Sequence, residues 1–131
     1  PDWELHNYGT LDETFLRIEN LPTNMFLHPP VKDIASKYLE SSIYVLPSRY
    51  EGFGMVLIEA MSFGIPCIAF DCNYGPSDIV TNGEDGILVE AGEIDQFVEQ
   101  LFLLLKNLNH QVFDYFFQQY LQELQIFYEH L

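Results

Sequence analysis

Short apolar runs alternate along the chain with longer segments whose apolar residues recur at helical spacing. The runs are bounded by Gly, Pro, Asn or Ser, which is typical of strands buried on both faces of a sheet. This alternation predicts an α/β fold: a doubly wound, Rossmann-like parallel sheet with helices on both faces, in a single domain. The predicted strands are 3–8, 25–28, 43–46, 67–71 and 87–89, and the predicted helices are 33–39, 54–63, a short one around 79, and 94–108.

The last segment of the chain has a pattern of its own. Between residues 111 and 131 apolar residues, many of them aromatic, recur at helical spacing opposite Gln and Glu. This predicts a C-terminal amphipathic helix after an α/β domain of residues 1–110. The stripe either packs on the domain's own helices or stays exposed and drives self-association through residues 111–131. Membrane adsorption is disfavoured because the polar face has no Lys or Arg.

Charge narrows the classes of partner. Twenty acidic residues oppose five basic ones among 131, giving a formal net charge of -15. That field repels nucleic acid and anionic lipid, so neither is an expected partner of the bulk surface. With 48% hydrophobic residues the chain is also unlike a disordered protein.

The cysteines suggest the compartment. Cys67 lies inside the apolar run 67–71 and Cys72 follows it, in neither a C-x-x-C nor a zinc-ligand pattern. We expect both to be small core residues in a reducing, cytoplasmic environment. We see no metal-ligand cluster in the sequence.

The segment Pro47-Ser-Arg-Tyr-Glu-Gly-Phe-Gly54 carries the strongest candidate chemistry. It follows the strand 43–46, and in an open parallel sheet ligands bind beyond the carboxyl ends of the strands. Gly52 and Gly54 let the backbone approach a ligand closely. The helix that begins near Gly54 offers unpaired N–H groups to an anion, for which a diphosphate is the natural candidate.

Two carboxylates accompany this loop, with seven residues between them. Glu51 lies in the loop, and Glu59 lies on the helix between Ile58 and Ala60. An unpaired charge in such apolar surroundings is costly, so we expect a buried Glu59 with a binding role. Phe53, between the glycines, is either a packing anchor or a wall of the site.

Two other segments are less specific. His28 ends the strand 25–28, and a strand-end residue is favoured over a catalytic base or a ligand. Asn73–Asp78 begins with a cluster of turn residues.

The spacing of Glu51 and Glu59, with its proline and both glycines, closely resembles the E-x(7)-E element of retaining nucleotide-sugar glycosyltransferases of the GT-B architecture, glycosyl transferases group 1. The resemblance runs from Trp3 to about Leu108. Within it, Asn73–Asp78 is either a simple turn or, as the resemblance implies, the loop after the family's fifth strand, which faces the cleft. It implies that Glu51 is the catalytic-site carboxylate that holds the donor sugar, and that Glu59 binds the ribose. The donor-binding residues that the resemblance implies are Arg49, Gly52, Phe53, Gly54, Met55, Val56 and Glu59, with Pro30 and Val31 near the base.

By the same resemblance, residues 1–110 form the donor half of an enzyme that builds a polysaccharide or glycolipid in the cytoplasm, at the inner face of the membrane for the full-length protein. Its substrate is a UDP- or GDP-sugar, with no cofactor and no catalytic metal, and its acceptor domain is a missing N-terminal partner. The chain opens with Pro1, which favours a piece of a longer protein. The family's first strand and its phosphate-neutralising Arg and Lys precede the part that matches, and Leu11 replaces a second glycine. We therefore expect weak donor binding and an inactive fragment.

Other functions stay open at this stage. A nucleotide-sugar epimerase of the same architecture would bind the same donors, whereas a noncatalytic Rossmann-like interaction module would bind none. A phosphorylase needs a cofactor-bearing lysine, and no lysine is placed for it. An oxidoreductase is disfavoured because G-x-G-x-x-G is absent. For the sheet, we predict that strand 3–8 pairs directly with strand 43–46, closing the place of the absent strand in the order 2-1-3-4-5.

Overall fold

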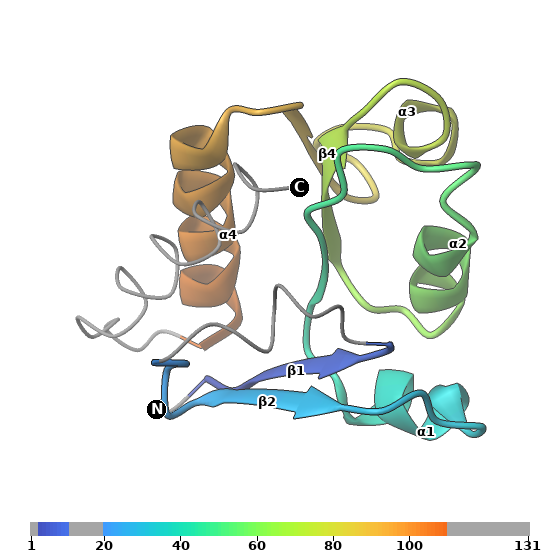
Figure 1. Ribbon diagram of the computed structural model, residues 1–131. Helices are drawn as coiled ribbons and strands as arrows, with labels where there is room; N and C mark the ends of the chain where they lie inside the picture. Colours follow the sequence, from blue (N-terminus) through green and yellow to red (C-terminus); the bar gives the residue numbers. More distant parts are fainter. Residues whose placement is uncertain (1–2, 11–19, 110–131) are drawn as a thin grey trace. The chain divides into compact units, whose positions relative to one another are not determined.

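The computed structural model describes residues 3–10 and 20–109, which fall into two compact units (Figure 1). The first holds the described residues up to Ile34 and the second holds Ala35–Asn109, and each is described by itself. The elements are β1 (Leu5–Tyr8), β2 (Met25–His28), α1 (Ile34–Glu40), β3 (Tyr44–Leu46), α2 (Met55–Ser62), β4 (Cys67–Asp71), α3 (Pro76–Ile79), β5 (Ile87–Glu90) and α4 (Ile94–Asn109).

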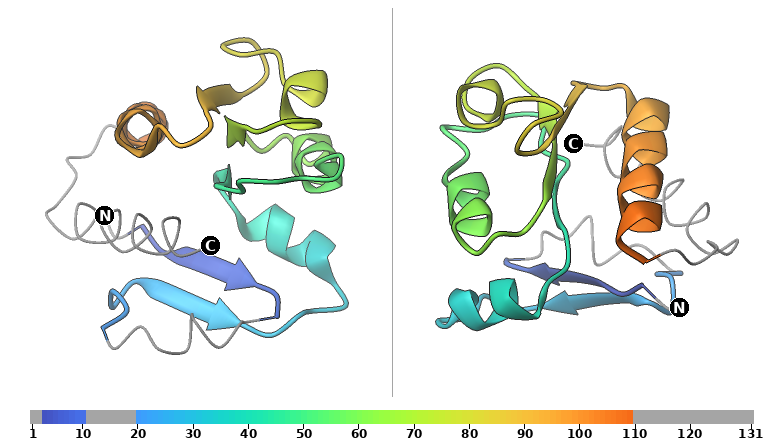
Figure 2. Two further views of the ribbon diagram at one scale, coloured as in Figure 1. Left: turned by 45° about the horizontal axis from the view of Figure 1, so that its top comes forward. Right: turned by 180° about the vertical axis from the view of Figure 1, so that it is seen from behind.

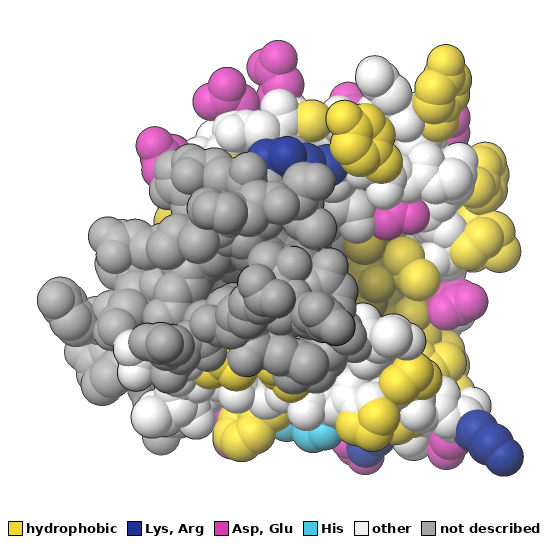
Figure 3. Space-filling model, in the orientation of Figure 1, with side chains coloured by type: hydrophobic (Ala, Val, Ile, Leu, Met, Phe, Trp, Pro, Cys, Tyr) yellow, Lys and Arg dark blue, Asp and Glu magenta, His cyan; other side chains and the backbone are white. Residues whose placement is uncertain are grey.

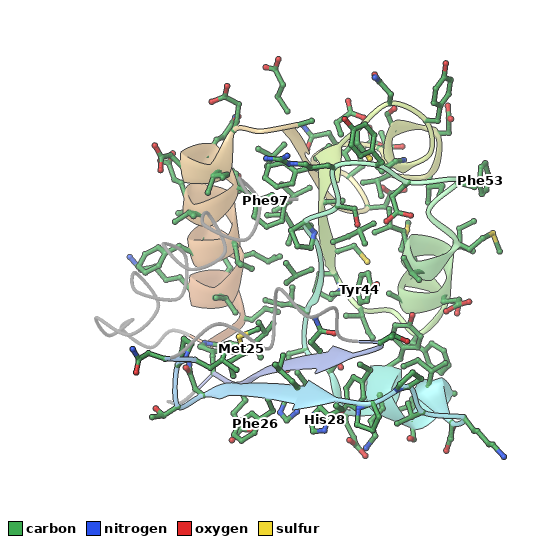
Figure 4. All side chains as sticks on the ribbon, in the orientation of Figure 1. Met25, Phe26, His28, Tyr44, Phe53 and Phe97 are labelled. Atoms are coloured by element: carbon green, nitrogen blue, oxygen red, sulfur yellow. The ribbon has the colours of Figure 1, made fainter. Side chains whose placement is uncertain are left out.

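The first unit contains a two-stranded parallel sheet, in which Leu5 pairs with Met25 and Tyr8 with His28. Side chains alternate between the two faces of each strand. Figure 4 shows Phe26 and His28 on the same side of β2, opposite Met25.

Aromatic rings form a ladder on that face. The Tyr8 and His28 centroids lie 4.5 Å apart and those of His6 and Phe26 lie 5.0 Å apart, both pairs stacked. His6 Nδ1 and His28 Nε2 are 2.9 Å apart, and His6 Nε2 lies 3.0 Å from a Glu4 carboxylate oxygen. His28 is thus the last residue of its strand, as predicted, with its ring held in this ladder.

The second unit contains a three-stranded parallel sheet in the order β3-β4-β5. In both views of Figure 2, α2 and α3 lie on one side of this sheet and α4 lies on the other. Helices α2 and α3 contact β4, and α4 contacts β4 and β5. Parallel strands with helices on both faces confirm the predicted α/β class.

The core of the second unit lies under α2. Leu57, Ala60, Ile68 and Ala69 are fully buried, because the apolar run 67–71 leaves both faces of β4 covered. On the opposite face Phe70 packs on Phe97 of α4, with centroids 4.5 Å apart (Figure 4). The strand and helix boundaries of this unit agree with the sequence prediction within about one residue at each end.

The predicted pairing of the first strand with 43–46 is wrong. β1 pairs with β2 in one sheet, and β3 pairs with β4 in another. The prediction assumed that the neighbours of an absent strand would close up. Closing requires complementary side chains on both faces as well as two free edges, and the apolar pattern specifies burial without specifying the neighbour.

Both cysteines are free and buried, as expected. Cys67 is 1% exposed, and its thiol donates to the carbonyl oxygen of Ile65 at 3.3 Å. Burial, followed by the charge of Asp85, raises the Cys67 pKa from 9.0 to about 11. Burial also raises the pKa of Cys72.

These thiols predict a loss of stability at alkaline pH. The folded state keeps the Cys67 proton to a higher pH than the unfolded chain does, so the stabilising effect is complete below pH 9 and is lost as pH rises through about 11. We expect the free energy of unfolding to fall by up to about 3 kcal/mol from this thiol. Urea unfolding followed by circular dichroism at stepped pH measures it. Cys67→Ser, whose hydroxyl does not ionise in this range, should make the slope shallower, and the shares of Cys72, Tyr38 and Tyr44 should remain. An unchanged slope would contradict the assignment.

The predicted helix of residues 111–131 and its self-association lie outside the described residues and stay predictions. Within residues 3–10 and 20–109, no helix is long and apolar enough to cross a membrane.

Candidate functional site

Two loops meet at one edge of the β3-β4-β5 sheet. Leu46 pairs with Ala69 in parallel, so both strands end at the same edge. The loop 47–54 leaves β3 there, and the loop 72–75 leaves β4. A Cβ on Gly75 would lie 2.6 Å from the carbonyl oxygen of Phe53, so only glycine allows this approach. The segment after β4 therefore faces the glycine loop, as one of its two predicted interpretations requires.

Glu51 is half-buried within this pair of loops. The pKa of the buried Cys72 thiol is raised first by burial and further by the negative charge of Glu51. The same carboxylate contributes to the raised pKa of Tyr44, after burial and Tyr38. The Glu51 charge therefore acts on side chains from β3 and from the end of β4.

The N-terminus of α2 is open to an anion. Its N-cap is Gly54, with a left-handed φ of 79° and no capping side chain, and the first turn has no acidic residue. The Leu57 N–H donates to the Gly54 carbonyl at 2.9 Å. In the described part of the chain, the preceding N–H groups of Met55 and Val56 donate to no acceptor. Two donors and the positive end of a helix dipole thus remain for a ligand.

The expected burial of Glu59 is wrong. Leu57 and Ala60 turn inward, and Glu59 is exposed beside Ile58, which is 39% exposed. The helical period places residues 57 and 60 on one face and 58 and 59 on the other, so apolar neighbours in sequence do not enclose this carboxylate.

Glu59 instead has a partner that sequence reasoning missed. The Tyr38 hydroxyl, from α1, donates to Glu59 Oε2 at 3.0 Å. Tyr38 is 6% exposed, and its ring contacts those of Tyr44 and Phe63. Tyr38 lies within the stretch from Trp3 to about Leu108 that resembles the family, and this was the one available signal.

Aromatic side chains are exposed on both loops. Tyr50 is 85% exposed, Phe53 is 52% exposed and Tyr74 is 81% exposed. Figure 4 shows the Phe53 ring turned outward from the loop before α2, and Figure 3 shows hydrophobic side chains at the surface in that region. Phe53 therefore does not anchor the core with its side chain, and its role as a wall of the site stays a prediction.

The other predicted site residues are Arg49, Pro30 and Val31. Arg49 is half-buried in the same loop as Glu51. Pro30 and Val31 are exposed in the first unit, so their place near the base stays a prediction. Among the residues that the structure describes, no three His, Cys, Asp or Glu side chains form a group that could hold a metal ion.

Comparison with known proteins identifies a family. The model described as "Glycosyl transferases group 1" matches residues 8–112. An uncharacterized glycosyltransferase of Haemophilus influenzae is 37% identical over 112 residues, which are 82% of this chain and 32% of that protein. The lipopolysaccharide 1,6-galactosyltransferase of Salmonella typhimurium is 44% identical over 72 residues, 55% of this chain and 20% of that protein.

Two solved structures are similar to this chain along most of its length. The crystal structure of TarM superposes with a TM-score of 0.73 at 26% identity, covering 94% of this chain and 24% of that chain. The apo form of the lipopolysaccharide outer core galactosyltransferase WaaB gives 0.68 at 26% identity, covering 97% of this chain and 41% of that chain. The chain spans about a third of the length of the Haemophilus influenzae relative.

Proposed function

Because this chain belongs to the glycosyl transferases group 1 family, we propose that it forms the donor-binding part of a retaining glycosyltransferase that takes its sugar from a UDP- or GDP-sugar. The product would be a surface polysaccharide or glycolipid. That class is supported by the names of relatives such as the galactosyltransferase of Salmonella typhimurium and an amylovoran biosynthesis glycosyltransferase of Erwinia amylovora.

The observation that carries the proposal is the uncapped N-terminus of α2 between two carboxylates. The N–H groups of Met55 and Val56, at the positive end of the helix dipole, suit a diphosphate. Glu51 and Glu59 would then receive the hydroxyl groups at the two ends of the donor. An anion site flanked by hydroxyl acceptors fits a nucleotide sugar better than it fits a free phosphate.

Each residue has a chemical task in this proposal. Glu51, at the loop, holds hydroxyls of the donor sugar, while Glu59, about one turn into α2, accepts both hydroxyls of the ribose. Gly52 and Gly54 keep the backbone close to the phosphates, and Phe53 forms a wall of the site. Arg49, in the same loop, adds positive charge on the side of the diphosphate.

Transfer increases the negative charge on the departing diphosphate. Donors that are already oriented toward that charge stabilise the transition state without reorganising. The dipole of α2 and the first N–H groups of the helix are fixed by packing of Leu57 beneath them. We propose that transfer itself also needs the acceptor domain of a full-length enzyme, so the 131-residue chain binds donor without turning it over.

Calorimetry with UDP, UDP-sugars and their GDP counterparts tests this proposal on the 131-residue chain. We expect weak binding to one of the two bases. Glu59→Ala should lower the affinity at least about tenfold, since hydrogen bonds to a charged acceptor contribute about 1.5–3 kcal/mol each. Glu99→Ala, which removes an exposed glutamate from α4, is the matched control and should bind as the parent chain does.

Two results would count against the proposal. A chain that binds neither nucleotide nor nucleotide sugar at millimolar concentration would favour the noncatalytic interaction module. Tight binding that Glu59→Ala leaves unchanged would preserve a donor site but remove Glu59 from it.

A further inference from the structure

Tyr38 and Glu59 come from different elements, 21 residues apart, and meet at the surface of the second unit. The hydroxyl of Tyr38 on α1 donates to Glu59 Oε2 on α2 at 3.0 Å. The tyrosine is buried, whereas the glutamate is exposed. The contact therefore joins a fixed donor to an acceptor that solvent would otherwise leave mobile.

Two aromatic neighbours fix the phenol ring. Phe63, which follows α2, stacks on Tyr38 with centroids 5.4 Å apart and planes at 21°. Tyr44 of β3 packs against it at 5.8 Å with planes at 56°. The ring is thus held by contacts from β3 and from the end of α2, and its hydroxyl oxygen has little freedom to move.

The hydroxyl stays a donor at neutral pH. Burial, followed by the hydrogen bond to Glu59 and the charge of that carboxylate, raises the pKa of Tyr38 to about 12. A carboxylate has two oxygens and about four acceptor positions. The bond from Tyr38 uses one of these positions and leaves the others, with all of Oε1, for incoming hydroxyl groups.

We propose that Tyr38 is a positioning residue, which holds the Glu59 carboxylate in the orientation that accepts the two ribose hydroxyls of the donor. This inference rests on the proposed function of Glu59. A free glutamate side chain loses conformational freedom when a ligand fixes it, and that loss weakens binding. A carboxylate already held by a buried phenol loses less.

The test removes one oxygen atom from Tyr38. In the full 131-residue chain, Tyr38→Phe should weaken UDP or GDP binding about three- to tenfold, the effect expected for one hydrogen bond to a charged group. The 2′,3′-dideoxy form of the same nucleotide should bind equally to the Tyr38→Phe and parent chains, because it lacks the hydroxyls that Glu59 accepts. A general loss of structure would weaken both ligands alike.

Two further variants separate the possible failures. In a Glu59→Ala chain, Tyr38→Phe should cause no additional loss, since the residue acts through Glu59. Tyr44→Phe makes the same chemical change on a neighbouring ring and should leave the affinity within about twofold of the parent, because that hydroxyl has no recorded bond to Glu59 in the described residues.

The outcomes are distinct. If the parent chain binds neither nucleotide, the proposed function fails and this inference fails with it. If the parent binds and Tyr38→Phe binds equally well, or loses affinity equally for the dideoxy nucleotide or in the Glu59→Ala chain, the donor site stands and the positioning role is overturned.

Discussion

Replacing Gly75 with alanine is expected to destabilise the second unit by about 3 kcal/mol or more and to disturb the candidate donor site. The new Cβ would lie 2.6 Å from the Phe53 carbonyl oxygen and 2.8 Å from its carbonyl carbon, and these are backbone atoms that cannot turn aside. Overpacking of this kind costs about 1–3 kcal/mol. The φ of Gly75 is 108°, which adds about 1–2 kcal/mol for a residue with a Cβ.

Gly64→Ala is the matched control, because it separates backbone strain from close approach. Gly64 also has a positive φ, 72°, but nothing lies within 4 Å of a Cβ built there. We expect a loss of about 1–2 kcal/mol from φ alone. Urea unfolding of both variants compares them, and equal losses would show that the loop 47–54 is not tightly packed against Gly75.

Leu57→Ala is the second large effect. The Leu57 side chain is fully buried in the core cluster beneath α2, so its truncation leaves a cavity in that core. Such substitutions cost about 2–5 kcal/mol. We expect a lower urea midpoint with an unchanged slope.

The neighbouring residue supplies the control for Leu57. Ile58 is 39% exposed on the other side of the same helix turn, so Ile58→Ala should cost less than about 1 kcal/mol. If the two alanine variants were equally stable, the inward face of α2 would be assigned wrongly, and with it the outward orientation of Glu59.

The sequence predicted the elements of the second unit well for a physical reason. Its strands are continuous apolar runs between glycine, proline and polar turns, so the boundaries are visible locally. The run 67–71 coincides with β4, and the short helix predicted around residue 79 is α3. The spacing of Glu51 and Glu59 likewise led to the family, which the match over residues 8–112 confirms.

The predictions that failed depended on which residues are neighbours in space. The sheet partner of strand 43–46 is set by complementary packing, and a hydrophobic run does not encode it. Glu59 appeared enclosed because Ile58 and Ala60 adjoin it in sequence, although the helix turns them to different faces. The bond from Tyr38 to Glu59 and the approach of Gly75 to Phe53 each join segments about twenty residues apart, beyond the reach of any local pattern.

The contact between Gly75 and Phe53 has a practical consequence for exchanging the loop 47–54 between relatives. Residues 47–54 of this chain fit against a turn whose glycine leaves no room for a side chain. A loop grafted from a relative with a different backbone path at the position of Phe53 would collide with that turn or leave a gap beside it. The two loops therefore form one transplantable module, and a chimera should carry residues 47–54 together with 72–76.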